Sequence, residues 1–400
     1  MRLKEVSPIR QTKQESHRKK NGFAKLWEDL FGETQGPMDL TFLILVLILL
    51  TIGLIMLFSA SYANAYYLMG NSFHYISRQM AFAVVGVGAM LAASKIDYHF
   101  WRRFAIPMMA LSIVLLLVVF AMPAINHAHR WIFIGSSFNF QPSEVAKFAV
   151  VLLFSHLIDV NYQRMHKFEY GILPFGAILG VLAVLLIAEP HLSGTILIVG
   201  LGVIMMIVGG IRLSHLFLAG GAGGTALILL VLVLGKWDRM MGRIEHWLNP
   251  FLDPRGEGFQ TIQSLYAIGS GGLLGSGIGN SRQKYLYLPE PQNDFIFSIV
   301  CEELGLIGAA IIIILFALLL WRGFVIALRA KDKFGCLMAV GLTAQVGLQT
   351  ILNIAVVTNT VPNTGIGLPF FSYGGTALMM LLAQMGIVLS ISRQSSLERE

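Results

Sequence analysis

Several charged residues lie within or beside apolar runs, where a charge is unfavourable unless it has a partner or a function. Glu144 and Lys147 belong to the motif Gln141-Pro-Ser-Glu-Val-Ala-Lys147 at the start of one such run, and Asp294 opens another. Glu303 follows about two turns further along the second run, and we expect it to have a buried hydrogen-bonding role, with a purely structural pairing as the alternative. Carboxylates can act as general bases and lysines can stabilise developing negative charge. These side chains are therefore candidates for catalysis.

Each of these residues also has a purely structural interpretation. Ser143 is a natural N-cap for the helix that follows it, and Glu144 in the first turn would favour the helix dipole. Lys147 could extend to the membrane interface, and Asp294 could be an ordinary carboxylate at a helix terminus. Because Lys147 lies only about one turn inside its helix, an ion pair between Lys147 and Asp294 is a further prediction.

Cations accompany a glycine-rich run at residues 269–279. Arg282 and Lys284 follow this run, and Arg130 lies in an earlier segment predicted to be on the same side of the membrane. The run lacks the Lys-Ser/Thr ending of a P-loop, which argues against an ATP site. Glycines with cations nearby could hold a pyrophosphate through backbone N–H groups. Alternatively, they could only allow the loop to fold back on the membrane.

A polar, glycine-rich and uncharged segment at residues 359–375 is the last cluster. The candidates for lining a cavity are the residues at its end, Ser372, Tyr373, Gly374 and Gly375. Alternatively, the segment could simply end one helix and begin the next. The turn at residues 189–195 has ordinary turn composition. His127 and His129 are near each other, but no Cys or carboxylate joins them at ligand spacing, so no metal site is predicted.

The composition predicts a membrane protein that positions these residues on helices. Of 400 residues, 56% are hydrophobic and 13% charged, with a mean hydropathy of +0.70, whereas soluble domains carry about 25% charged residues. Apolar runs of spanning length predict an all-α fold with about ten transmembrane helices. They lie near residues 40–60, 79–94, 104–123, 144–159, 172–188, 193–209, 214–234, 294–321, 336–358 and 374–392.

The distribution of basic residues predicts the orientation. Most of the 29 Lys and Arg residues fall on one side if both termini are cytoplasmic, so the basic excess reflects topology rather than nucleic-acid binding. Residues 1–38 form a basic tail in which a short amphipathic helix is predicted, with partial disorder as the alternative. Residues 39–394 form one membrane domain with a long outer loop at 235–293, and residues 395–400 are a cytoplasmic tail. Two cysteines are too few for a disulfide framework.

The ordered motifs of the chain resemble those of the SEDS proteins (shape, elongation, division and sporulation), especially their division and sporulation members. The resemblance covers residues 40–394. The residues that carry it are Gln141–Lys147, Gly258–Ala267, Ser281–Lys284, Leu288–Gln292, Asp294–Phe297, Glu302–Gly305 and Leu368–Gly375. In this chain Pro190-His-Leu-Ser-Gly-Thr195 replaces a common Pro-Asp-Leu-Gly-Thr, which puts any role of an acid there in doubt.

The resemblance implies a peptidoglycan glycosyltransferase that polymerises lipid II at the outer face of the bacterial cell membrane. It implies Asp294 as the essential aspartate, with Glu144 and Lys147 as supporting residues. It also implies a class B penicillin-binding protein and other division proteins as partners, and a location at the division septum. The role in division, sporulation or elongation stays open.

The chemistry of this reaction suggests further roles. Asp294 would be the base for the attacking sugar hydroxyl, and Arg130, Arg282 and Lys284 would contact the departing pyrophosphate. A divalent cation such as Mg²⁺ or Mn²⁺ could share that duty. The alternatives are a transporter that flips lipid II, for which no internal repeat is found, and a non-catalytic scaffold of the division machinery.

Overall fold

The computed structural model describes residues 36–395 except 124–129, 135–137, 234, 236 and 257. The chain is largely helical, with one small antiparallel pair of strands in which Phe133 pairs with Asn139. The predicted helix in the N-terminal tail and the residues His127 and His129 lie outside the described residues.

Each predicted span overlaps one helix of the described residues, with boundaries that differ by up to nine residues. By length and apolar composition, six helices of the described part can cross a membrane: the segments at 40–69, 74–93, 168–188, 296–328, 333–357 and 375–395. The elements are α2 (Leu40–Met69), α3 (His74–Ala93), α4 (His99–Arg102), α5 (Ala105–Val119), β1 (Ile132–Ile134), β2 (Phe138–Phe140), α6 (Pro142–Asn161), η1 (Tyr162–Arg164), α7 (Phe168–Gly171), α8 (Leu173–Ala188), α9 (Leu192–Val208), α10 (Leu213–Val233), α11 (Trp237–Leu248), η2 (Pro250–Leu252), α12 (Phe259–Gly271), α13 (Ile296–Leu328), α14 (Lys333–Val357) and α15 (Gly375–Ser395).

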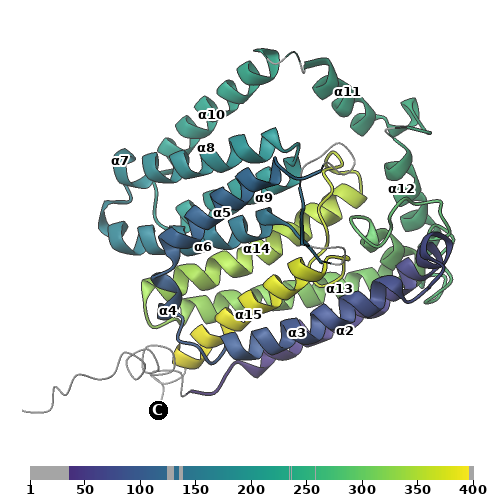
Figure 1. Ribbon diagram of the computed structural model, residues 1–400, viewed down its shortest axis with the longest axis horizontal. Coiled ribbons are helices and arrows are strands. Elements are labelled where there is room, and N and C mark those ends of the chain that lie inside the picture. Colours follow the sequence, from purple (N-terminus) through teal and green to yellow (C-terminus); the bar gives the residue numbers. More distant parts are fainter. Residues whose placement is uncertain are drawn as a thin grey trace, which may run out of the picture.

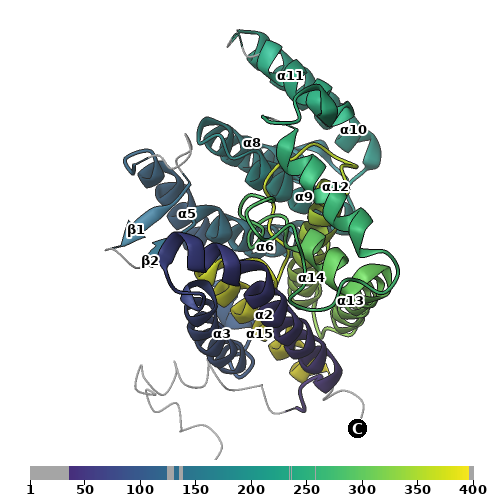
Figure 2. The same ribbon diagram turned by 90° about the vertical axis from the view of Figure 1, so that its right-hand side faces the viewer.

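Helices α6 and α14 form the centre of the bundle (Figure 1). Nearly every residue of α6 from Val145 to Ser155 is buried, as are most residues of α14. Helix α15 lies along α3, where Gly386 allows close approach because an added Cβ would lie 2.3 Å from the Met90 carbonyl oxygen. Helices α10 and α11 lie at the periphery (Figure 2). Because α6 is surrounded by other helices, Glu144 and Lys147 near its start are shielded from lipid chains by protein.

The two ends of the described chain lie together at one end of the bundle. The Asp39 amide donates to Ser392 Oγ at 3.1 Å, and Arg393 Nε donates to the Gly36 carbonyl at 3.0 Å. Arg322, near the end of α13, also forms an ion pair with Asp39 at 2.7 Å. Residues 36–39 and 392–393 therefore lie next to each other and to the end of α13.

A cluster of titratable side chains joins α4 to the start of α14. His99 Nδ1 lies 2.8 Å from Asp97 Oδ1, and His99 Nε2 lies 3.4 Å from Asp332 Oδ2. Hydrogen bonds to these two carboxylates raise the pKa of His99 to about 9. His99 is therefore protonated at neutral pH and links the two carboxylates.

Candidate functional site

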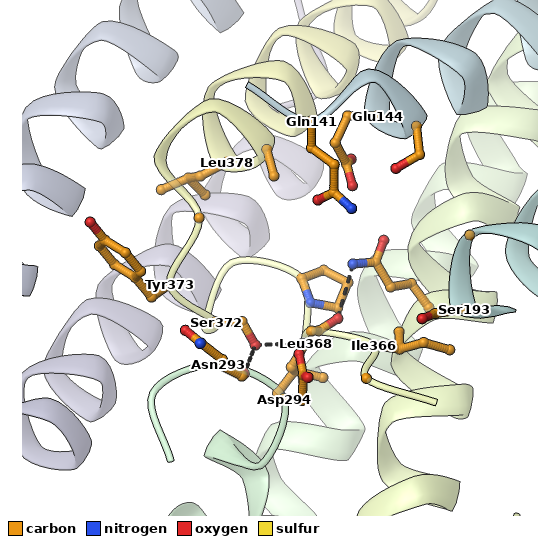
Figure 3. Close-up of a pocket in the computed structure, with 18 of the residues that line it drawn as sticks. Gln141, Glu144, Ser193, Asn293, Asp294, Ile366, Leu368, Ser372, Tyr373 and Leu378 are labelled. Atoms are coloured by element: carbon orange, nitrogen blue, oxygen red, sulfur yellow. Dashed lines mark hydrogen bonds between the residues drawn. The ribbon is translucent and has the colours of Figure 1, made fainter. Parts of the chain in front are cut away.

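A cavity of about 480 Å³ lies between the starts of α6 and α9, the segment before α13 and the loop at residues 365–375 (Figure 3). Gln141 and Glu144 point into it from α6, and Asp294 lies across from them. Its charged lining residues are Arg130, Glu144, Lys147, Glu290 and Asp294. Polar groups from segments far apart in the sequence thus meet in one space.

Lys147 lies on the wall of this cavity and is 3% exposed. Its ammonium nitrogen lies 2.8 Å from Glu144 Oε1, one turn earlier in α6, and 3.4 Å from Gln349 Oε1 of α14. The predicted ion pair between Lys147 and Asp294 is therefore wrong for this structure. Glu144 satisfies the lysine within the same helix, because residues at i and i+3 face each other.

The segment that carries Asp294 is held by its backbone. Asn353 of α14 donates through Nδ2 to the Asp294 carbonyl at 2.7 Å and to the Ile366 carbonyl at 2.6 Å. Gly365 has φ of 72°, and a Cβ at this position would lie 3.0 Å from Asp294 Oδ2. No described residue donates a hydrogen bond to the Asp294 carboxylate, so its oxygens are available to a ligand.

The loop that ends in Ser372-Tyr-Gly-Gly375 holds the same segment from the other side. Ser372 Oγ donates to the Asn293 carbonyl at 2.5 Å and accepts from the Leu368 amide at 2.7 Å (Figure 3). The Tyr373 amide donates to the Gln292 carbonyl at 2.9 Å. All four predicted lining residues of this loop lie on the cavity wall. The Ser372 hydroxyl is fully used in positioning the backbone next to Asp294.

The two glycines of this loop allow α3 to approach it. Gln79 of α3 donates to the Ser372 carbonyl and accepts from the Gly374 amide, both at 3.2 Å. A Cβ on Gly375 would lie 2.1 Å from the Phe82 ring. Glycine is therefore needed at position 375 for the packing of α3 against the start of α15.

Burial shapes the electrostatics of the cavity. Desolvation, with a smaller contribution from Glu290, raises the pKa of Asp294 to about 6, while Arg130 acts in the opposite direction. His191, which precedes α9, is 5% exposed, and desolvation lowers its pKa to about 3. Thus Asp294 is mostly ionised at neutral pH and His191 is neutral. Arg130 donates to the Pro190 carbonyl at 2.5 Å and faces the same space.

Lys284 and Glu303 lie outside the cavity, in a cluster between α2 and α13. Their side chains are fully buried and form an ion pair at 2.7 Å. The Ser59 hydroxyl of α2 donates to the Glu303 carboxylate and lies 2.8 and 2.6 Å from its two oxygens. The expected buried hydrogen-bonding role of Glu303 is therefore present. The proposed contact of Lys284 with phosphate is not supported here, because Glu303 neutralises its charge away from the cavity.

The glycine-rich run packs against α13, which is neither of the two arrangements predicted for it. The amides of Ser276 and Gly277 donate to the carbonyls of Glu302 and Glu303 at 2.9 and 3.0 Å. Gly305 breaks the helical backbone of α13 with φ of 67°, and a Cβ there would lie 2.6 Å from the Leu273 carbonyl oxygen. The amides of Ser276 and Gly277 are therefore occupied by α13 and do not face the cavity as donors for a pyrophosphate. Arg282 is exposed and does not line the cavity.

Several cavity residues were not predicted from the sequence. Gln349 of α14 lines the cavity, and Asn353, one turn later, holds the backbone beside it. Polar amides at i and i+4 in an apolar helix were the signal for both. Gln141, rather than Ser143, is the N-cap of α6, and its amide nitrogen lies 3.3 Å from His191 Nε2. Among the described residues, no group of three His, Cys, Asp or Glu side chains could hold a metal ion.

The fold and the cavity define a helical, multi-pass membrane protein with a polar site at one end of its bundle. The chain belongs to the FtsW/RodA/SpoVE family of cell cycle proteins, which matches residues 39–397.

Individual relatives agree with this family. Stage V sporulation protein E of Bacillus subtilis is 42% identical over 89% of this chain and 97% of its own. The probable peptidoglycan glycosyltransferase FtsW of Trichlorobacter lovleyi is 38% identical over 88% of this chain and 93% of its own.

Solved structures share the fold. A chain from a peptidoglycan synthase complex that coordinates polymerisation and crosslinking is 27% identical, with a TM-score of 0.73 over 90% of this chain and 98% of its own. The rod shape determining protein RodA of Thermus thermophilus is 25% identical, with a TM-score of 0.65 over 89% and 97% of the two chains.

Proposed function

We propose that this chain is a peptidoglycan glycosyltransferase that polymerises lipid II at the outer face of the cytoplasmic membrane. The names of its FtsW relatives, probable peptidoglycan glycosyltransferases, support the reaction class. The observation that carries the assignment of the site is Asp294, a carboxylate on the cavity wall with a raised pKa and no hydrogen-bond donor among the described residues. Such a group can accept a proton from a bound hydroxyl.

In the proposed reaction, Asp294 removes the proton from a sugar hydroxyl as its oxygen attacks the anomeric carbon of a second lipid II molecule. The bond from that carbon to the lipid pyrophosphate breaks, and the leaving group carries away the electron pair. Arg130 and Lys147 are the cations that line the cavity, and they would stabilise this charge. Glu144 keeps Lys147 in place until phosphate oxygens compete for it.

The topology that we propose has ten transmembrane helices, cytoplasmic termini and an outer loop at residues 235–293. The basic tail at residues 1–38 and the short segment after residue 394 would both be cytoplasmic. This arrangement is supported by the position of residues 36 and 393 at one end of the bundle. We further propose a septal or sporulation site of action and a class B penicillin-binding protein as partner, because a relative in fold comes from a synthase complex.

Purified full-length protein supplied with lipid II tests this function, with glycan strands resolved by gel electrophoresis. Asp294→Asn preserves size and polarity but removes the base, so the variant should fold and form no strands. Glu169→Gln, an exposed carboxylate outside the cavity, should behave as wild type. Strand formation by the Asp294→Asn variant would contradict the assignment of the base.

The same preparation distinguishes the two alternative functions. A lipid flippase would move labelled lipid II across vesicle membranes without joining sugars. A scaffold would do neither, and it would support division equally well with Asn at position 294. Glycan strands made by wild-type protein alone would exclude both alternatives.

A further inference from the structure

A series of aromatic side chains leads from the cavity to the exposed outer end of α2. Tyr373 lines the cavity, and its ring lies 5.0 Å from that of Tyr75 in an edge-to-face arrangement. In Figure 3 it occupies the side of the view opposite Ser193 and Ile366. We call this series the aromatic row; its members are Tyr373, Tyr75, His74, Phe73, Phe58, Tyr62 and Tyr285.

Ring contacts join the row in two groups, one from Tyr373 to His74 and one from Phe73 to Tyr285, and the consecutive residues Phe73 and His74 link the two groups through the backbone. The His74 and Tyr75 ring centroids lie 5.3 Å apart, and Phe73, the residue before them, stacks on Phe58 at 5.4 Å. Phe58 then lies 6.2 Å from Tyr62, which lies 6.2 Å from Tyr285. The hydroxyls of Tyr62 and Tyr285 are 2.5 Å apart. The row ends at an open surface, because Phe73 is 61% and Tyr285 44% exposed.

The outer end of the row lies beyond the hydrocarbon core of the membrane. The apolar part of α2, from Leu40 to Phe58, covers about 28 Å at about 1.5 Å per residue, close to the thickness of about 30 Å of that core. The sequence that follows, Ser59-Ala-Ser-Tyr-Ala-Asn-Ala, is markedly more polar. Tyr62 and Tyr285 therefore face the headgroup region or water, where exposed rings need a partner other than lipid chains.

The chemistry of the row suits a neutral, polyhydroxylated ligand. Tyrosine combines an apolar ring face with a polar hydroxyl, and a pyranose combines an apolar C–H face with hydroxyl groups. Hydrogen-bonding side chains accompany the rings: Asn64 donates to Gln292 at 3.3 Å, and Asn293 donates to Glu290 at 2.8 Å. Among the described residues, Lys284 is the only cation that lies over a ring of the row, and it is buried beneath Tyr62 at 4.8 Å from the ring centroid.

We propose that the aromatic row is a binding track for the polysaccharide product, along which the growing strand leaves the cavity. This inference rests on the proposed function, since a polymerase must keep hold of a strand that has outgrown its active site. The row is continuous with the cavity, because its first residue, Tyr373, lines the cavity wall. The row itself carries no charged side chain, so its occupant is expected to be the neutral sugar strand.

Chain length is the property that such a track controls. We expect the double variant Phe73→Ala, Tyr285→Ala to shorten the mean glycan strand by about tenfold, because each ring contact with a ligand contributes roughly a factor of three in retention. The rate of forming the first glycosidic bond should stay within about twofold of wild type, as neither residue lines the cavity. Phe73→Trp and Tyr285→Phe retain the rings and should restore strand length.

Tyr66 and Tyr67 provide a matched control. They pair with each other at the same end of α2, 61% and 63% exposed, and contact no ring of the row. Tyr66→Ala, Tyr67→Ala should leave strand length unchanged. Equal shortening in this control, or wild-type strand length in the Phe73, Tyr285 variant, would overturn the track. So would a loss of thermal stability without a change in length, which would identify the row as a membrane-interface anchor.

Binding of chitohexaose, a soluble β-1,4-linked N-acetylglucosamine hexamer, separates this proposal from the proposed function. Saturation-transfer NMR should detect contact with wild-type protein, with about tenfold weaker binding to the Phe73→Ala, Tyr285→Ala variant. Binding by wild-type protein that makes no strands from lipid II would support the track and contradict the polymerase. If wild-type protein makes strands, but neither chitohexaose binding nor strand length changes in the Phe73→Ala, Tyr285→Ala variant, the polymerase is supported and the track is contradicted.

Discussion

Replacing Lys284 by Met is expected to destabilise the fold rather than weaken substrate binding. The substitution removes the ammonium that lies 2.7 Å from Glu303 and leaves a carboxylate whose side chain is completely buried. Two donors to the carboxylate remain: the Ser59 hydroxyl, 2.8 and 2.6 Å from its two oxygens, and the Ser281 amide at 3.2 Å. They do not neutralise the charge, so the loss should be about 3–5 kcal/mol, the usual effect of breaking a buried ion pair.

A double-mutant cycle isolates this interaction. Unfolding of the detergent-solubilised protein should be measured for Lys284→Met, Glu303→Gln and the combination. We expect either single change to be costly, and the combination to recover most of the loss because no buried charge is left unpaired. Arg282→Gln is the control, since its side chain is exposed and only its amide binds Glu302.

The opposite pattern would refute this reasoning. If Lys284→Met unfolds like wild type but raises the KM for lipid II, then the ion pair opens and Lys284 binds phosphate. Equal stability of all three variants would show that the pair contributes nothing to the fold.

Three further predictions concern other groups. Glycosyl transfer should fall about tenfold between pH 7 and pH 5 as Asp294, with a pKa of about 6, takes up a proton; a flat profile would exclude it as the base. Lys147→Met should lower both stability and activity, and adding Glu144→Gln should restore only stability, as measured by thermal unfolding and strand synthesis. Gly305→Ala should reduce the yield of folded protein, because its φ of 67° and the nearby Leu273 carbonyl disfavour any side chain; normal expression would argue against this.

Helices were easier to predict from the sequence than side-chain pairs. Long apolar runs ended by polar segments were enough to place the helices. The predicted start of α13, at residue 294, lies two residues before its observed start at Ile296. The partner of Lys147 was missed because a lysine near the membrane surface has several carboxylates in reach. Glu144, three residues away on the same helix, required the least extension of the chain.

The environment of Lys284 could not be predicted locally. Its pairing with Glu303 depends on the fold of the intervening loop, which lies on the break in α13 at Gly305. The amide of Asn353 likewise joins two segments, at Asp294 and Ile366, that are far apart in the sequence. Motif spacing indicates which segments carry chemistry, but tertiary contacts decide which side chains meet.

Asn353 bears on how a polymerase of this kind would advance along its product. One amide holds the backbone at Asp294 and at Ile366, and Ser372 ties the preceding residue to the same loop. Asp294 is held together with these segments, so under the proposed function it would not follow the strand end after each addition. Translocation by one disaccharide would instead require the strand to slide through a fixed catalytic frame, driven by exchange of lipid carriers. Repeated cycles would then reuse one rigid geometry, and the strand would be the only part that moves.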